Sequence, residues 1–410
     1  MFTKVNYVRI KKVSNFRDFC DRERSRTHNL QSRNLTLYPI ELRGQNFKTS
    51  ANVYKVCVNQ KLFSLLIFLL LLFSCKEPSN NIDKEYLKHT TTVKISTDKD
   101  SNIILFYPNL RKTIAISKKE LPIKNCYVIT TPTIGYLSEL GLIKNVKGIC
   151  NPEYVYNEEL FNRVLSNEVE NLGNEQNFNL EKMISSDTNF IFTSYNANLQ
   201  NTYKLLEDNG KKIIFIEDYK EQTPLGKAEI IKIFGRLFNK VVEAENKFKI
   251  IKSNYIYIKS LATKIETKPT AFAKIMYGDV WFVPQGNSIS ATYYSDAGFN
   301  YLWKNTLGEK SLELSFENVF QKAENADFWL DVSDVENKEF LLNFNEFYRN
   351  FKAYKTSRMF AISGRKNSRG ANDFYESGCV RVDWILNDLA FIAHPKQFAK
   401  HKLIYYKQLK

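Results

Sequence analysis

Aromatic, hydroxyl, arginine and carboxylate side chains follow several short apolar runs that are predicted to be strands. In open α/β sheets, ligands bind at the loops that follow the carboxyl ends of the strands. Aromatic rings there suit a large, partly apolar chelate or a planar ring system, and an arginine fork suits a catecholate, carboxylate or propionate group. For any single aromatic residue, core packing is the alternative role. The candidate ligand contacts are Thr131, Thr133, Tyr154, Tyr156, Tyr195 and Asn196 in the first half, and Tyr277, Trp281, Arg369, Asn372, Asp373, Phe374 and Tyr375 in the second half.

The sequence holds no recognisable catalytic motif. It has no Gly-x-Ser-x-Gly elbow, no His-Glu-x-x-His and no P-loop. A zinc or manganese site would need two or more histidines from the loops around a cleft. The four histidines instead lie in the leader, before the predicted domain and near the C-terminus: His28, His89, His394 and His401. We therefore expect no enzyme, no catalytic residue, no intrinsic cofactor and no metal site of the protein's own, so that any metal arrives already chelated. A chelatase-like or hydrolytic two-lobed α/β enzyme is the alternative.

A short apolar run precedes Cys75. Residues 62–73 form a run of twelve residues, which is shorter than the roughly twenty that a membrane-spanning helix needs. Lys55 and Lys61 give it the positive flank of a signal peptide. The sequence Leu72-Phe-Ser-Cys75 resembles a bacterial lipobox, in which the cysteine is acylated and becomes the new N-terminus. We predict a lipoprotein signal peptide at 55–74, a lipid anchor at Cys75 and a flexible tether over 75–90.

Positive charge is concentrated before the predicted anchor. Residues 1–75 carry thirteen Lys and Arg against four Asp and Glu, so only +6 of the formal net charge of +15 belongs to residues 76–410. Because nucleic-acid binding needs a basic stripe on a folded domain, we expect no nucleic-acid partner. Residues 1–54 are interpreted as a basic leader or an over-extended translation start. Cys126, Cys150 and Cys379 form no Cys-x-x-Cys pair and are expected to be buried, with the question of a disulfide left open.

The rest of the chain alternates predicted strands and helices, which favours parallel sheets covered on both faces. Short alternating runs from Thr91 to Ser117 indicate a small β element that leads into an α/β lobe over 91–223. A helical region follows over 224–266. Within it, apolar residues from Val241 to Ile265 recur at spacings of three and four, which predicts one helix of about 25 residues. Residues 267–410 are predicted to form a second α/β lobe, with the long helix as a rigid strut between the two.

Two glutamates occupy matched places in the two halves. Asn179-Leu-Glu181 and Ser315-Phe-Glu317 each open a predicted helix that ends before a strand, 136 residues apart. An acid in the first turn favours the helix dipole and can help to cap the helix. The repetition indicates a weak internal repeat in addition to that local role.

Three stretches carry a resemblance to a known family: Trp281-Phe-Val-Pro-Gln-Gly, Ala297-Gly-Phe-Asn-Tyr-Leu-Trp303 and Gly370-Ala-Asn-Asp-Phe-Tyr-Glu-Ser-Gly378. Residues 92–410 resemble the solute-binding proteins of iron-siderophore, haem and vitamin B12 ABC importers, in particular the lipoprotein branch of Bacteroidetes-type bacteria. The resemblance implies two Rossmann-like lobes joined by a single long helix, with ligand bound in the cleft between them. It also implies that Glu181 and Glu317 dock onto arginines of a permease dimer.

The resemblance further implies a monomeric receptor in the cell envelope, lipid-anchored and facing the periplasm or the outer surface. A ferric siderophore is the expected ligand, with cobalamin or haem as alternatives bound in the same way. A surface carbohydrate-binding or adhesion lipoprotein is a third reading, against which the strut and the paired glutamates count.

Overall fold

The computed structural model describes residues 86–333, 335 and 337–410, and all of these belong to one compact unit. The predicted leader, signal peptide and anchor at Cys75 lie outside the described residues. So does most of the predicted tether, apart from residues 86–90.

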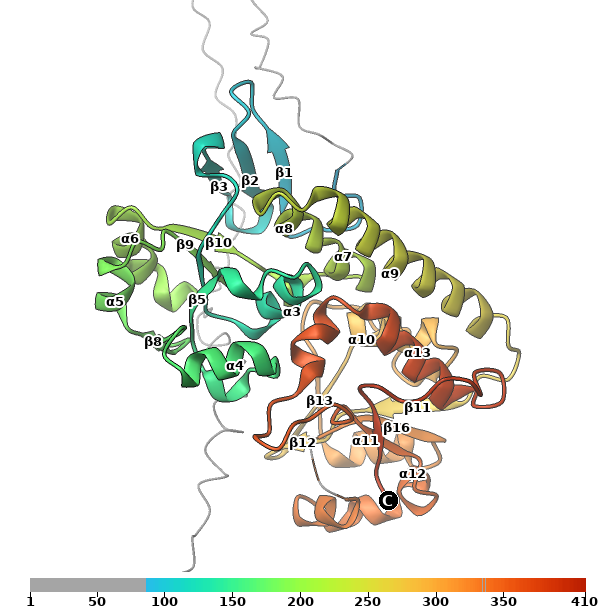
Figure 1. The fold of residues 1–410 in the computed structure, drawn as a ribbon. Helices are drawn as coiled ribbons and strands as arrows, with labels where there is room; N and C mark the ends of the chain where they lie inside the picture. Colours follow the sequence, from blue (N-terminus) through green and yellow to red (C-terminus); the bar gives the residue numbers. More distant parts are fainter. Residues whose placement is uncertain (1–85, 334, 336) are drawn as a thin grey trace, which may run out of the picture. The chain divides into compact units, whose positions relative to one another are not determined.

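The first large sheet is the centre of what we call the N-lobe (Figure 1). Its five strands are all parallel, in the order β10-β9-β4-β5-β6. All four residues of Phe190–Thr193 are buried, as expected of a strand covered on both faces. The strands are β4 (Cys126–Val128), β5 (Val146–Ile149), β6 (Glu170–Asn171), β9 (Phe190–Thr193) and β10 (Lys212–Phe215); the helices are α3 (Thr131–Glu139), α4 (Glu158–Leu165), α5 (Leu180–Ser185) and α6 (Gln200–Asp208).

The second large sheet is the centre of the C-lobe. Its order is β14-β11-β16-β17-β18, and β18 runs antiparallel to β17 while the other pairs are parallel. The C-lobe also contains a separate, smaller antiparallel sheet, β12-β13-β15. The strands are β11 (Thr270–Ala273), β12 (Met276–Tyr277), β13 (Val280–Val283), β14 (Asn300–Tyr301), β15 (Leu312–Leu314), β16 (Phe328–Val332), β17 (Met359–Ala361) and β18 (Lys407–Gln408); the helices are α10 (Ile289–Asp296), α11 (Phe316–Ala323), α12 (Lys352–Lys355) and α13 (Val382–Ala393).

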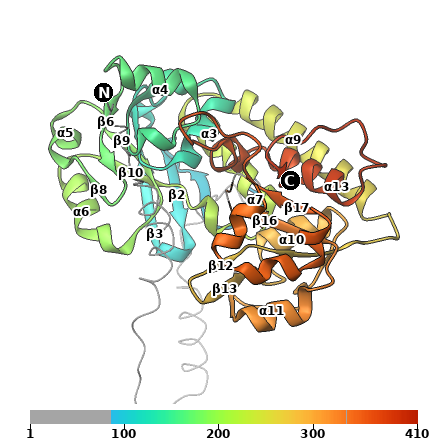
Figure 2. The same ribbon diagram turned by 90° about the horizontal axis from the view of Figure 1, so that it is seen from below.

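A single long helix, α9 (Val241–Ala262), connects the two sheets in the chain. Its 22 residues correspond to about 33 Å at 1.5 Å per residue. It packs against α8 (Ile231–Leu237) and α7 (Pro224–Glu229), which follow the N-lobe, and against α13 of the C-lobe, so it lies alongside both lobes (Figure 2). The predicted two-lobed fold with a helical strut is confirmed.

The buried face of α9 explains why this segment is a helix. Its buried residues recur at spacings of four and three: Ala244, Phe248, Ile251, Tyr255, Ile258 and Ala262. Val241 and Leu261, which also fit the apolar pattern, are exposed at the edges of this face. The helix is therefore shorter, and its buried stripe narrower, than the apolar pattern predicted.

The described end of the predicted tether is fixed to the folded unit. The Glu229 carboxylate accepts hydrogen bonds from the backbone N–H groups of His89 (2.6 Å) and Thr90 (3.0 Å). The guanidinium of Arg236 lies 4.1 Å from the ring centre of Tyr86. Residues 86–90 are therefore part of the fold, contrary to the expectation of a flexible tether reaching to residue 90.

The same segment leads into a three-stranded antiparallel sheet, β1 (Lys94–Thr97), β2 (Ile103–Tyr107) and β3 (Lys112–Ile116). Tyr107 joins this sheet to the N-lobe, because its hydroxyl accepts a hydrogen bond from the backbone N–H of Phe215 at 3.2 Å. This is the small β element that the sequence predicted.

Candidate ligand site at the seam between the lobes

Two loops from opposite lobes meet where the sequence predicted a cleft. In the N-lobe, the loop after β5 contains a short 3-10 helix, η4 (Pro152–Tyr154), and leads into α4. In the C-lobe, the loop after β17 contains η9 (Asp373–Tyr375) and η10 (Ser377–Cys379) and leads into α13. Both loops follow the carboxyl ends of parallel strands, the usual place for ligand binding in such sheets. We call their contact region the seam.

Glu376 stands at the centre of the seam. Its carboxylate accepts hydrogen bonds from the backbone N–H of Tyr156 at 2.8 Å and of Asn157 at 3.1 Å. The residue is only 3% exposed. Burial raises the pKa of Glu376, the two N–H donors lower it and the Asp373 carboxylate raises it again, with the result at about 8.

Arg369 forms a second contact across the seam. Its guanidinium donates from Nη1 to both oxygens of Glu158, at 2.8 and 3.1 Å, and from Nη2 to the carbonyl of Val155 at 3.2 Å. The same guanidinium lies 3.7 Å from the ring centre of Phe161. The ion pair lowers the pKa of Glu158, which is an exposed residue on α4.

Arg365 brings a second guanidinium to the seam. It pairs with Asp373 (Nε to Oδ2, 3.0 Å) and lies 5.5 Å from the ring centre of Tyr156 in the N-lobe. It also lies 5.9 Å from the ring centre of Trp384. The seam therefore combines two arginines with aromatic rings from both lobes.

The backbones of the two lobes touch at Gly135. A Cβ atom on this residue of α3 would lie 2.1 Å from the carbonyl oxygen of Glu376, so only glycine fits without a shift. One residue later, the Tyr136 hydroxyl bonds to the carbonyl oxygens of Lys227 at 2.8 Å and Cys379 at 3.4 Å. The turn that carries Glu376 therefore packs directly against α3.

Several of the predicted ligand residues come together at the seam. Tyr156 and Arg369 make the cross-lobe contacts described above, and Tyr154 and Tyr375 are exposed beside them in sequence, at 44% and 46%. Phe374 is half-buried, with its ring set edge-on to those of Tyr375 and Tyr405.

Asn372 and Asp373 shape the loop from within. The Asn372 side chain donates to the carbonyl of Ile362 at 2.7 Å and accepts from the N–H of Phe374 at 3.0 Å. Asp373 accepts hydrogen bonds from the hydroxyl of Ser377 at 2.6 Å and from Arg365. Both residues are buried, so they hold the loop that presents their neighbours.

Trp281 lies in the core of the C-lobe and not at the seam. It is 0% exposed, packs against the rings of Phe272, Trp329 and Tyr348, and donates from Nε1 to the carbonyl of Ala273 at 3.0 Å. We correct the prediction for this residue: packing, the alternative for any aromatic, accounts for its position.

Tyr195 and Tyr277 belong to other segments than the two loops that form the seam. Tyr195 follows β9, where its N–H donates to Glu217 at 2.6 Å and its ring packs against Phe215 and Tyr203. Tyr277 is half-buried at the end of β12, paired in register with Val280.

Sequence reasoning missed the residues that join the lobes: Glu158, Phe161, Arg365 and Glu376. Glu376 lies inside the stretch Gly370–Gly378, on which part of the family resemblance rests. Its role depends on a contact between residues 220 positions apart. A single sequence contains no signal for such a contact.

The two predicted docking glutamates are exposed, each in the first turn of a helix. Glu181 lies in α5, whose N-cap Asn179 accepts a hydrogen bond from Lys182, and Glu317 lies in α11, whose N-cap is Ser315. Hydrogen bonds from its own backbone N–H and from Ser315 lower the pKa of Glu317. Both carboxylates thus face solvent at a helix start.

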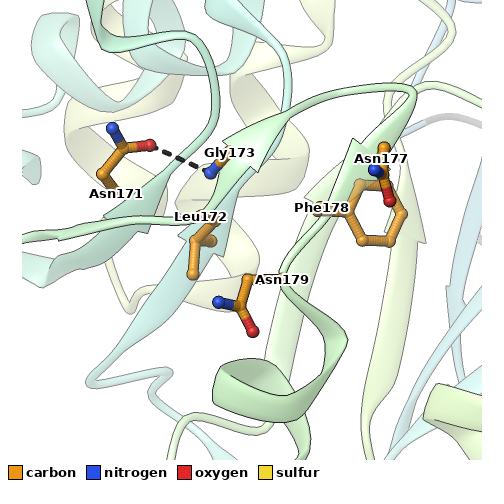
Figure 3. Close-up of a pocket in the computed structure, with 6 residues that line it drawn as sticks. All are labelled: Asn171, Leu172, Gly173, Asn177, Phe178 and Asn179. Atoms are coloured by element: carbon orange, nitrogen blue, oxygen red, sulfur yellow. Dashed lines mark hydrogen bonds between the residues drawn. The ribbon is translucent and has the colours of Figure 1, made fainter.

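An open hollow of about 440 Å³ lies on the N-lobe and is lined in part by Asn179, the N-cap of α5 (Figure 3). The Asn171 side chain accepts a hydrogen bond from Gly173 at its rim, at 2.9 Å. None of the predicted ligand residues lines it. Its lining residues are Asn171, Leu172, Gly173, Asn177, Phe178 and Asn179.

Within the described part of the chain, no helix combines the length and the apolar composition needed to cross a membrane. Among the same residues, no group of three or more His, Cys, Asp and Glu side chains is placed to hold a metal ion. Cys126, Cys150 and Cys379 are buried free thiols, so none of the three forms a disulfide.

The fold has clear counterparts among known proteins, although no family model matches the chain. An uncharacterized lipoprotein of Methanocaldococcus jannaschii is 25% identical over 293 residues, which cover 69% of this chain and 68% of the relative. A periplasmic solute-binding protein of Veillonella parvula has a TM-score of 0.53 at 17% identity, over 76% of this chain and 89% of that one. A possible iron-binding periplasmic solute-binding protein of Staphylococcus epidermidis has a TM-score of 0.52 at 16% identity, over 67% and 99%. The chain has the two-lobed fold of periplasmic solute-binding proteins.

Proposed function

We propose that this protein is the substrate-binding lipoprotein of an ABC importer, which captures a chelated iron compound of the ferric siderophore class and delivers it to a permease. The observation that carries the proposal is the seam itself. There, arginines and aromatic rings from two lobes converge at the carboxyl ends of parallel strands. The solute-binding fold and the lipoprotein relative support the same reading.

The chemistry of the seam suits an anionic, partly apolar ligand. Arg365 and Arg369 pair with carboxylates of the protein, and a guanidinium fork donates hydrogen bonds to a catecholate or carboxylate oxygen of a chelate in the same way. Tyr154, Tyr156, Phe374 and Tyr375 supply ring surface beside them. These side chains bind and orient, and we assign the protein no reaction.

The remaining parts of the function are proposals of the same kind. Cys75 anchors the chain in the cell envelope through lipid, and the folded part faces the periplasm or the outer surface. Glu181 and Glu317 dock onto basic residues of the two permease subunits. Acids at a fixed separation on a rigid body select a matching pair of positive sites by charge complementarity.

Thermal unfolding with ligand tests the proposal. A compound that binds the folded state alone raises the melting temperature, by an amount that grows with its concentration over Kd. The purified chain should be stabilised by ferric siderophores of the catecholate or carboxylate type and not by their iron-free forms. Stabilisation by haem or cobalamin alone would move the assignment to those ligands. No shift with any member of the panel would refute the proposal.

A further inference from the structure

The carboxyl group of Glu376 joins the two lobes through main-chain groups. Both of its oxygens accept hydrogen bonds, and the donors are the consecutive N–H groups of Tyr156 and Asn157 at the start of α4. Because the donors belong to the backbone, their position follows the N-lobe as a body and not one flexible side chain. The contact can therefore exist only while the two lobes are together at this point.

The surroundings of Glu376 leave little slack in this contact. Its carbonyl oxygen lies so close to Gly135 that a Cβ atom there would approach to 2.1 Å. Tyr136 fastens the next turn, since its hydroxyl lies 3.4 Å from the carbonyl oxygen of Cys379. The contacts of this turn with α3 therefore keep the carboxyl group of Glu376 within hydrogen-bond distance of the two amides.

The second cross-lobe contact differs in kind. The Arg369 pair uses Glu158, an exposed side chain that remains hydrated when the pair separates. Exposed ion pairs of long side chains contribute little to stability. Glu376 instead exchanges full hydration for two hydrogen bonds and burial, so its contribution depends wholly on whether the lobes are closed.

The contact combines an unfavourable and a favourable free-energy contribution. Burying a carboxyl group costs free energy, and the two amide hydrogen bonds offset that cost only while both donors are in place. When the lobes separate, the carboxyl group returns to water and regains its hydration. Because the cost of burial and the gain from the hydrogen bonds oppose each other, such a contact is suited to forming and breaking repeatedly.

We propose that Glu376 is a latch between the lobes, which holds them together at the seam and must release Tyr156 and Asn157 before the cleft opens. The proposal concerns the lobes alone and goes beyond the proposed import function. It stands or falls independently of which ligand is bound.

Amide hydrogen exchange on the full, ligand-free chain tests the latch. In Glu376→Ala, the amides of Tyr156 and Asn157 lose their acceptor and should exchange at least tenfold faster than in the wild type. Glu376→Gln keeps an acceptor oxygen and should preserve much of the protection. Glu376→Asp keeps the carboxylate but shortens its reach, so it should behave like Glu376→Ala even if the alanine variant fails to fold. Glu346→Ala, which removes an exposed acid of the same lobe, is the matched control.

Small-angle scattering of the same samples distinguishes a latch from a local hydrogen bond. Glu376→Ala and Glu376→Asp should increase the radius of gyration relative to the wild type and to Glu346→Ala. Unchanged exchange at residues 156–157 in both variants would overturn the proposal. Faster exchange there with an unchanged radius of gyration would overturn it as well, because the carboxylate would then protect its two donors without holding the lobes.

Discussion

The guanidinium of Arg369 in the C-lobe lies over the ring of Phe161 in the N-lobe, 3.7 Å from the ring centre, while it binds Glu158 one turn earlier on the same helix. Arginine combines these two contacts because its planar fork stacks on one face and donates along its edge. Arg369 therefore links the C-lobe to the N-lobe through both contacts.

Replacement of Arg369 by alanine should lower the affinity for ligand strongly and the stability of the fold only slightly. The ion pair with the exposed Glu158 is screened by water and the ring contact is small, so the free energy of unfolding should fall only slightly. Affinity for a ferric siderophore, measured by fluorescence quenching, should fall at least tenfold. Arg349→Ala, which removes an exposed pair with Glu346, should change neither quantity. Unaltered affinity in Arg369→Ala would remove this residue from the ligand site.

Glu376 makes stability depend on pH in a definite direction. Its pKa is about 8 in the folded chain and 4.5 in the reference state, so the folded protein retains a proton that the unfolded chain has released. Stability from this group is complete below about pH 4.5 and is lost as pH rises through 8. At about 1.4 kcal/mol per pKa unit, the change amounts to a few kcal/mol at most.

The charged groups around Glu376 do not reverse that direction. Asp373 raises the pKa of Glu376 further, while Arg365 is paired with Asp373 and Arg369 with Glu158. Urea unfolding of the wild type and of Glu376→Gln between pH 5 and pH 9 measures the effect. The wild type should lose stability relative to the glutamine variant across this range. Parallel curves would show that the carboxyl group titrates normally in the fold.

Glu221 fixes the segment just before β1 in a similar way, through a carboxylate that binds backbone N–H groups. Its buried carboxylate accepts hydrogen bonds from the backbone N–H groups of Thr91 and Thr92, and from the Thr92 hydroxyl at 2.6 Å. Glu221→Ala leaves the buried N–H and hydroxyl donors of Thr92 without an acceptor and should lower the free energy of unfolding by about 2–4 kcal/mol. It should also speed proteolytic cleavage near residue 92. Glu309→Ala, an exposed site, should do neither; equal stability of the two variants would contradict the anchoring role.

The sequence predicted the parts of this fold that depend on local pattern. The apolar run Phe190–Phe192 indicated a buried strand, and the spacing from Ala244 to Ile258 indicated the strut. Trp281 illustrates the limit: an aromatic residue in a strand-like run fits a ligand site as well as a core, and only packing against Trp329 decides. Glu376 illustrates another limit, because neither its burial nor its donors in the other lobe leave a local signal.

The core position of Trp281 gives a direct test of that correction. Trp281→Ala removes a fully buried ring and should lower the free energy of unfolding by about 3–5 kcal/mol. Tyr375→Ala removes a ring that is 46% exposed at the seam and should cost at most about 1 kcal/mol. Denaturant unfolding compares them, with siderophore affinity as the second readout. A loss of affinity without loss of stability in Trp281→Ala would return this residue to the ligand site.

Charge reversal at the two exposed helix starts tests the docking role. Glu181→Lys and Glu317→Lys place like charges against the proposed basic sites of the permease, and like-charge contacts at an interface cost several kcal/mol. The double variant should abolish uptake of a radiolabelled ferric siderophore by cells while its affinity for that ligand and its melting temperature stay unchanged. Glu168→Lys with Glu346→Lys reverses two other exposed acids, one on each lobe, and should leave uptake intact. If both double variants reduce uptake equally, the effect comes from overall charge and the paired glutamates have no special part in docking.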